Sequence, residues 1–125
     1  MKIVYKNLIV CAFALSLFLS SCEYTTIEVD PPVLPPVDEE ISYAEYIAPI
    51  FAAKCVTCHV SRNPVLTSSA AYNSLINGNY VNTATPASSS LYVKVLGGHP
   101  GGGQVTTATE NALILRWIQE GAKNN

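Results

Sequence analysis

The chain has 125 residues, of which 49% are hydrophobic, and its formal net charge at pH 7 is −2. Its charged residues form no basic run and do not alternate with aromatic residues, which excludes a typical nucleic-acid-binding surface. The apolar residues are concentrated toward the N-terminal end, so the length available for a folded core is shorter than the total.

Residues 1–21 have the composition of a secretory signal. Two lysines precede an apolar stretch over residues 8–19, which is too short to be expected as a permanent membrane span. The sequence Leu-Ser-Ser-Cys22 that follows resembles the lipobox of bacterial lipoproteins, in which the cysteine becomes the first mature residue and is acylated. We therefore expect removal of residues 1–21 and a lipid anchor at Cys22 that attaches the protein to a membrane. The alternative is conventional signal cleavage beside an ordinary Cys22.

Residues 22–40 are predicted to be an acidic, proline-rich tether. They contain six acidic residues and no basic residue. The two Pro-Pro pairs at residues 31–32 and 35–36 remove backbone donors and favour an extended polyproline conformation, which the mutual repulsion of the acids reinforces. A domain held in this way would stand away from the lipid.

Residues 41–125 are expected to form one small domain. It begins with Ser42-Tyr-Ala-Glu45, which has the spacing of a capping box, and apolar residues then recur at helical intervals up to Phe51. Pro49 cannot continue an unbroken helix, so it should open a second short helix that leads into Cys55.

The motif Cys55-Val-Thr-Cys58-His59 is the C-x-x-C-H sequence of c-type haem attachment. Two thiols at this spacing can add to the two vinyl groups on one edge of a porphyrin, and the next residue then places its imidazole under the iron. The motif therefore predicts haem c as cofactor, bound by Cys55 and Cys58, with His59 as the proximal iron ligand. Covalent attachment would retain haem in a domain too small to enclose it, and the haem would form part of the core.

Three other interpretations of the same residues remain open. A C-x-x-C thiol–disulfide centre usually follows a strand at the start of a helix, and no strand is evident before Cys55. A zinc site needs four ligands, for which the domain offers Cys55, Cys58, His59 and the distant His99. A structural disulfide between Cys55 and Cys58 would be strained and would leave His59 without a role.

Three further helices are predicted after the motif. One should span residues 69–77 and stop at a left-handed Gly78, and another should span residues 89–96 and end at two glycines. The clearest runs from a capping box at Thr107 and Glu110 to Gly121, with apolar pairs at i, i+4 between them. Strand signals are weak, so the expected fold class is all-α, with three to five short helices around a covalently bound haem.

The segment from residue 47 to His59 resembles the opening of class I cytochrome c domains of bacterial lipoproteins, and residues 110–122 resemble their closing helix. This resemblance covers residues 41–122. It implies that the first and last helices cross near the haem edge, which would bring Ile47 and Phe51 against Trp117 and Ile118. Trp117 is expected to be a core residue rather than an electron conduit.

The chain departs from this family at the sixth iron ligand, which is usually a methionine on a loop before the closing helix. Its only methionine is Met1, which leaves with the signal. His99 occupies the corresponding interval between glycines and is the predicted distal ligand, with Lys94 as a weaker candidate and an exposed loop position as the alternative for His99. Two imidazoles would give a lower reduction potential than a methionine and a histidine.

These features together predict a membrane-anchored c-type cytochrome in the cell envelope, facing the periplasm or held at the outer membrane. It would be an electron carrier and not an enzyme, and its partners would be redox proteins and, through acylated Cys22, the lipid membrane. The alternative function is a haem-based ligand-binding, sensing or peroxidase-like module with an open distal site.

Overall fold

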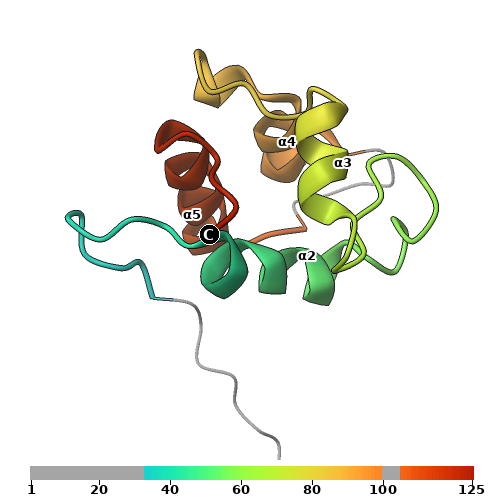
Figure 1. Ribbon diagram of the computed structural model, residues 1–125, viewed down its shortest axis with the longest axis horizontal. Helices are drawn as coiled ribbons and strands as arrows, with labels where there is room; N and C mark the ends of the chain where they lie inside the picture. Colours follow the sequence, from blue (N-terminus) through green and yellow to red (C-terminus); the bar gives the residue numbers. More distant parts are fainter. Residues whose placement is uncertain (1–32, 100–104) are drawn as a thin grey trace, which may run out of the picture. The chain divides into compact units, whose positions relative to one another are not determined.

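Short helices make up the fold, as shown by a computed structural model that describes residues 33–99 and 105–125 (Figure 1). The segments are η2 (Tyr43–Ile47), α2 (Ala48–Lys54), α3 (Ala71–Asn77), η3 (Pro86–Ser88), α4 (Ser90–Val93), η4 (Lys94–Gly98) and α5 (Ala108–Gln119). These described residues contain four α-helices and no strand, which confirms the predicted all-α class. The predicted signal segment and Cys22 lie outside them, as do residues 100–104.

The first helical region changes from π-helical to α-helical hydrogen bonding next to Pro49, but the expected break is absent, because Ile47 and Ala48 at the junction both have right-handed helical angles. The Ser42 hydroxyl accepts a hydrogen bond from the Glu45 amide at 3.3 Å and so caps the π-helical turn η2. Helix α2 then begins at Ala48, with Pro49 in its first turn. Helix α2 ends directly before Cys55.

A single apolar cluster lies between these helices. Ile47, Phe51, Trp117 and Ile118, which were expected to meet, are all almost completely buried in this cluster. The ring of Tyr43 lies 5.5 Å from that of Trp117, between centroids, and the Trp117 indole donates to the Lys123 carbonyl at 2.8 Å. Trp117 is therefore a core residue with a satisfied polar group.

Helix α3 ends where predicted, but not in the predicted way. Gly78 has a φ of −81°, and the left-handed residue is Asn79, with a φ of 56°. A Cβ on Gly78 would lie 2.4 Å from a ring carbon of Tyr80 and 2.7 Å from the Ser74 carbonyl oxygen. Gly78 is therefore needed for close packing under the Tyr80 ring, which corrects the expectation of a left-handed glycine stop.

The last two predicted helices are confirmed. Helix α4 continues into η4, which runs to Gly98 and loses helical geometry at Gly97, whose φ of +132° favours glycine. No strand forms around Val93 and Val95. Helix α5 begins with a complete capping box, in which Thr107 accepts from the Glu110 amide and Glu110 accepts from the Thr107 amide. No helix in the described ranges has the length and apolarity that crossing a membrane requires.

Candidate functional site

The C-x-x-C-H motif continues the chain direction of α2 for one more turn. Cys55 is the C-cap of α2, and the amides of Cys58 and His59 both donate to the Cys55 carbonyl, at 3.2 and 3.1 Å. This turn brings the two thiols and the imidazole to the wall of one cavity. Cys55 is partly buried and Cys58 is exposed, and both are free thiols in this structure.

The cavity beside the motif has a volume of about 530 Å³. This volume lies within the range of about 300–1,000 Å³ that is usual for cofactor and ligand pockets. Apolar side chains from α2, α3, α4, η4 and the loop at residues 55–66 provide much of its wall: Phe51, Leu66, Leu75, Leu91 and Val95. The polar lining includes Cys55, Cys58, His59 and His99, so the cavity collects every cofactor ligand predicted for the domain.

The His59 ring is oriented by its own loop. Its Nδ1 lies 2.8 Å from the Pro64 carbonyl oxygen and 3.3 Å from that of Arg62. A carbonyl can only accept, so Nδ1 carries the proton, and in the neutral imidazole Nε2 keeps its lone pair. A hydrogen bond from one ring nitrogen to a backbone carbonyl is the usual support for a histidine whose other nitrogen binds a metal.

His99 lies next to His59 in the same cavity. The ring centroids are 5.8 Å apart and the ring planes are inclined by 72°. A metal ion held between two imidazoles lies about 2 Å from each nitrogen, which places the ring centres roughly 6 Å apart. His99, the predicted distal ligand, therefore lies at a distance from His59 at which the two imidazoles could bind one metal ion. Lys94, the second candidate, also lines the cavity.

This donor set fits a haem. The cavity offers two thiols for thioether bonds, two imidazoles for the axial positions, and apolar surface for a macrocycle. Among residues 33–99 and 105–125, no three His, Cys, Asp or Glu side chains form a group able to hold a metal ion. Haem iron does not require such a group, because the porphyrin supplies four of its ligands.

The surroundings of Cys55 differ from those of a redox-active dithiol. Burial raises the pKa of the Cys55 thiol, the Glu110 carboxylate adds to this shift, and the Lys54 ammonium opposes it. The residue also follows the C-terminal end of α2, where the helix dipole disfavours a thiolate. Thiol–disulfide centres instead use a helix N-terminus and a lowered pKa to activate one cysteine.

An ion pair next to the motif joins α2 to α5. The Lys54 ammonium lies 2.6 Å from Glu110 Oε2, which also accepts from the Thr107 amide at 2.6 Å. Burial disfavours the Glu110 carboxylate, but hydrogen bonds from Lys54 and Thr107 outweigh this and hold its pKa below the ordinary value. One buried carboxylate therefore fixes the residue before Cys55 to the start of the last helix.

The sequence predicted the cysteines and histidines of this site but not their support. Arg62, Pro64 and Tyr80 line the cavity and had no recognisable signal in the sequence. The Lys54–Glu110 pair could have been proposed only from the expected contact of the first and last helices. A second cavity, of about 560 Å³, lies over α3 and contains no cysteine or histidine.

The chain was compared with protein-family models, with curated proteins and with solved structures, and none of the three comparisons found a match.

Proposed function

We propose that this protein is a lipid-anchored c-type cytochrome that transfers single electrons in the cell envelope. One haem c would be attached to Cys55 and Cys58, with His59 as proximal and His99 as distal iron ligand. The observation that supports this proposal best is the presence of all four side chains in one largely apolar cavity. The acylated Cys22 would hold the domain at a membrane.

When bound, the haem supplies reversible one-electron chemistry at iron. The chain's own residues position and tune it. Pro64 holds the His59 ring through Nδ1, which keeps Nε2 directed away from the loop. Phe51, Leu66 and Leu91 exclude water from the cavity, and two neutral imidazoles favour a lower potential than a thioether ligand would give.

The attachment of haem is tested by producing the full chain in bacterial cells with a cytochrome c maturation system. We expect the purified protein to carry the added mass of one haem after denaturation, and to give a c-type pyridine haemochrome spectrum. The variant C55A/C58A should lose the covalent haem. The control Cys22→Ala should keep the haem and lose only the lipid. Absence of haem from the unmutated protein would refute the proposal.

The distal ligand is tested separately by optical spectroscopy of the ferric protein. We expect a low-spin spectrum that becomes high-spin in His99→Ala, because removal of one imidazole leaves a weaker ligand or none. Lys94→Ala is the matched control and should stay low-spin. A high-spin unmutated protein that binds carbon monoxide when reduced would instead indicate the open-site sensor or peroxidase-like module.

A further inference from the structure

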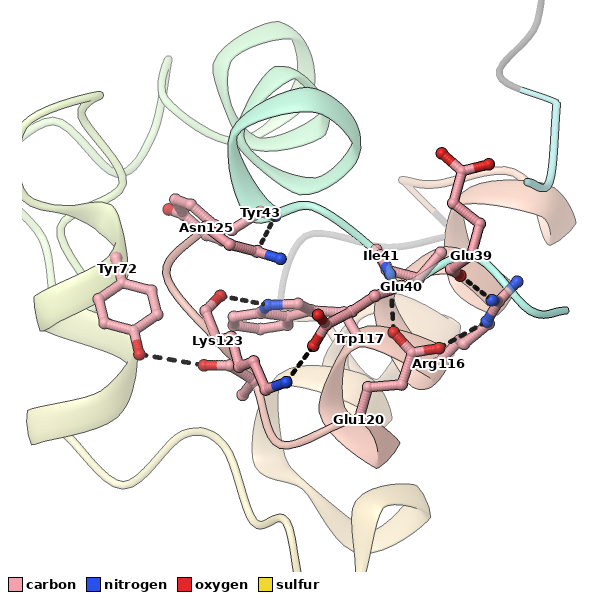
Figure 2. Close-up of polar contacts among 11 residues, drawn as sticks. Glu39, Glu40, Ile41, Tyr43, Tyr72, Arg116, Trp117, Glu120, Lys123 and Asn125 are labelled. Carbon is pink, nitrogen blue, oxygen red and sulfur yellow. Dashed lines mark hydrogen bonds and ion pairs between the residues drawn. The ribbon is translucent and has the colours of Figure 1, made fainter. Parts of the chain in front are cut away.

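Arg116 on α5 binds the proline-rich segment that precedes the domain, and Figure 2 shows its contacts with Glu39 and Glu120. Its two terminal nitrogens donate to the Pro35 and Pro36 carbonyls at 2.9 and 2.8 Å, and also to the Glu39 carbonyl. Its Nε is bonded to the Glu120 carboxylate at 2.7 Å, which fixes the plane of the guanidinium. One side chain therefore holds three backbone carbonyls, a geometry that lysine cannot reproduce.

Residues after Arg116 extend this attachment along the chain. The second oxygen of Glu120 accepts from the Ile41 amide at 2.7 Å, and Lys123 forms an ion pair with Glu40. Asn125 accepts from the Tyr43 amide at 2.8 Å through its side chain (Figure 2). We name residues 35–40 the docked segment, since they are fastened to α5 and to the residues that follow it.

The docked segment and the cavity lie at different ends of the described domain. Their residues do not overlap, since the cavity is formed by α2, α3, α4, η4, the loop at residues 55–66 and residues 80, 99 and 105. In Figure 1, residues 33–40 run beside α5 at one end of the long axis, and the loop that carries the C-x-x-C-H motif extends at the other. The docked segment therefore lies at the end of the domain remote from the cavity.

We propose that Arg116 orients the domain on the membrane, so that the end of the domain with the cavity lies away from the lipid and receives an electron-transfer partner on that side. This inference rests on the proposed lipid anchor and haem. Without these contacts the tether would be longer and the domain would turn more freely. Release of the six docked residues would lengthen the maximum reach of the tether by about 20 Å, at about 3.5 Å per residue.

The orientation is tested with haem-loaded lipoprotein in vesicles of phosphatidylcholine that contain a maleimide lipid. The zwitterionic lipid avoids attraction of the basic cavity residues Lys54, Arg62 and Lys94 to the surface. One cysteine is introduced at an exposed position, as Ser61→Cys near the motif or Asn124→Cys near the docked segment. The rate of coupling to lipid then reports the distance of each position from the membrane.

We expect Asn124→Cys to couple about threefold faster than Ser61→Cys or more, because its local concentration of maleimide is higher. Arg116→Ala should bring the ratio of the two coupling rates toward one. Arg116→Lys should give a ratio between that of Arg116→Ala and that of the unmutated background. Arg62→Ala, which removes an arginine at the cavity end, should keep the ratio. Equal rates in the unmutated background, or a faster Ser61→Cys, would overturn the proposal.

A second measurement covers the case in which Arg116→Ala fails to fold. Hydrogen exchange of the unmutated protein should show protection of the Glu39 amide, bonded to Pro36 at 3.1 Å, and of the Ile41 amide. Exchange of both at unfolded rates would refute the docking. Failure of the proposed function would be seen in different measurements. A protein that does not float with the vesicles carries no lipid anchor. Coupling of the protein without an introduced cysteine shows that Cys55 and Cys58 are not bonded to haem.

Discussion

Replacement of Glu110 by alanine should destabilise the domain more than any other single loss of charge near the site. Glu110 is only 6% exposed, and one of its oxygens accepts from both Lys54 and the Thr107 amide. Loss of the bond to Thr107 removes half of the cap of α5, which costs about 1 kcal/mol. Loss of the bond to Lys54 leaves a partly exposed ammonium that water can reach, which costs about 1–2 kcal/mol more.

The expected total is thus about 2–3 kcal/mol, which corresponds to a fall in Tm of roughly 10–20 °C for a domain of this size. The measurement is thermal and denaturant unfolding of the haem-loaded protein, followed by far-UV circular dichroism. Glu45 provides a matched control, because it occupies the same position after Ser42 but is exposed. Glu45→Ala should change the stability by less than about 0.5 kcal/mol.

The pH dependence of the Glu110 effect has a defined sign. The pKa of Glu110 is lower in the folded protein than the ordinary value of 4.5. Its contribution is therefore complete above the unfolded pKa and is lost as the pH falls through the folded pKa. The difference in stability between Glu110→Gln and the unmutated protein should shrink as the pH falls below 4.5. Equal stabilities of Glu110→Ala and Glu45→Ala at pH 7 would refute the reasoning.

Three further changes test the packing. Gly78→Ala should cost about 1–3 kcal/mol in denaturant unfolding, because the added Cβ meets the Tyr80 ring; an unchanged stability would contradict this. The Tyr43 hydroxyl is buried without a hydrogen-bond partner among the described residues, and burial beside Tyr72 raises its pKa from 10.0 to about 12. Stability should therefore fall as the pH rises from 10 to 12, where only the unfolded tyrosine ionises, and Tyr43→Phe should reduce that fall measurably. Thr106→Val should cost about 1–3 kcal/mol and raise the high-spin ferric fraction, since the buried Thr106 hydroxyl lies 2.5 Å from the Asn111 side-chain oxygen and 3.2 Å from the carbonyl of Val95, which lines the cavity with His99; a spectrum like that of the unmutated protein would contradict this role.

The features that the sequence predicted correctly are those whose partners lie within a few residues. Thr107 and Glu110 are three positions apart, so the chain itself brings the cap and its amide together. The C-x-x-C-H spacing likewise determines that Cys55, Cys58 and His59 share one turn. The role of Gly78 at the end of α3 was not predictable, because it depends on where the Tyr80 ring packs once the chain has turned.

Contacts between distant segments had no signal of this kind. Arg116 reaches the carbonyl of Pro35, which lies 81 positions earlier, and Lys54 reaches Glu110 across 56 positions. Backbone carbonyls carry no sequence information, so the docked segment could not be identified from residue types. Only the packing of the helices determines which carbonyls come within reach.

The two histidines of the candidate site also differ in whether neighbouring or distant residues determine their positions. The half with His59 is determined locally, by one turn after α2 and a loop that returns five residues later to Pro64. The position of His99 depends instead on the ends of its loop: Gly97 turns the chain with a φ of +132°, and the Thr106 hydroxyl lies 3.2 Å from the Val95 carbonyl. The distance between the two rings therefore follows from how α4 and α5 pack. A change that loosens this packing should affect the distal ligand before it affects the attachment of haem.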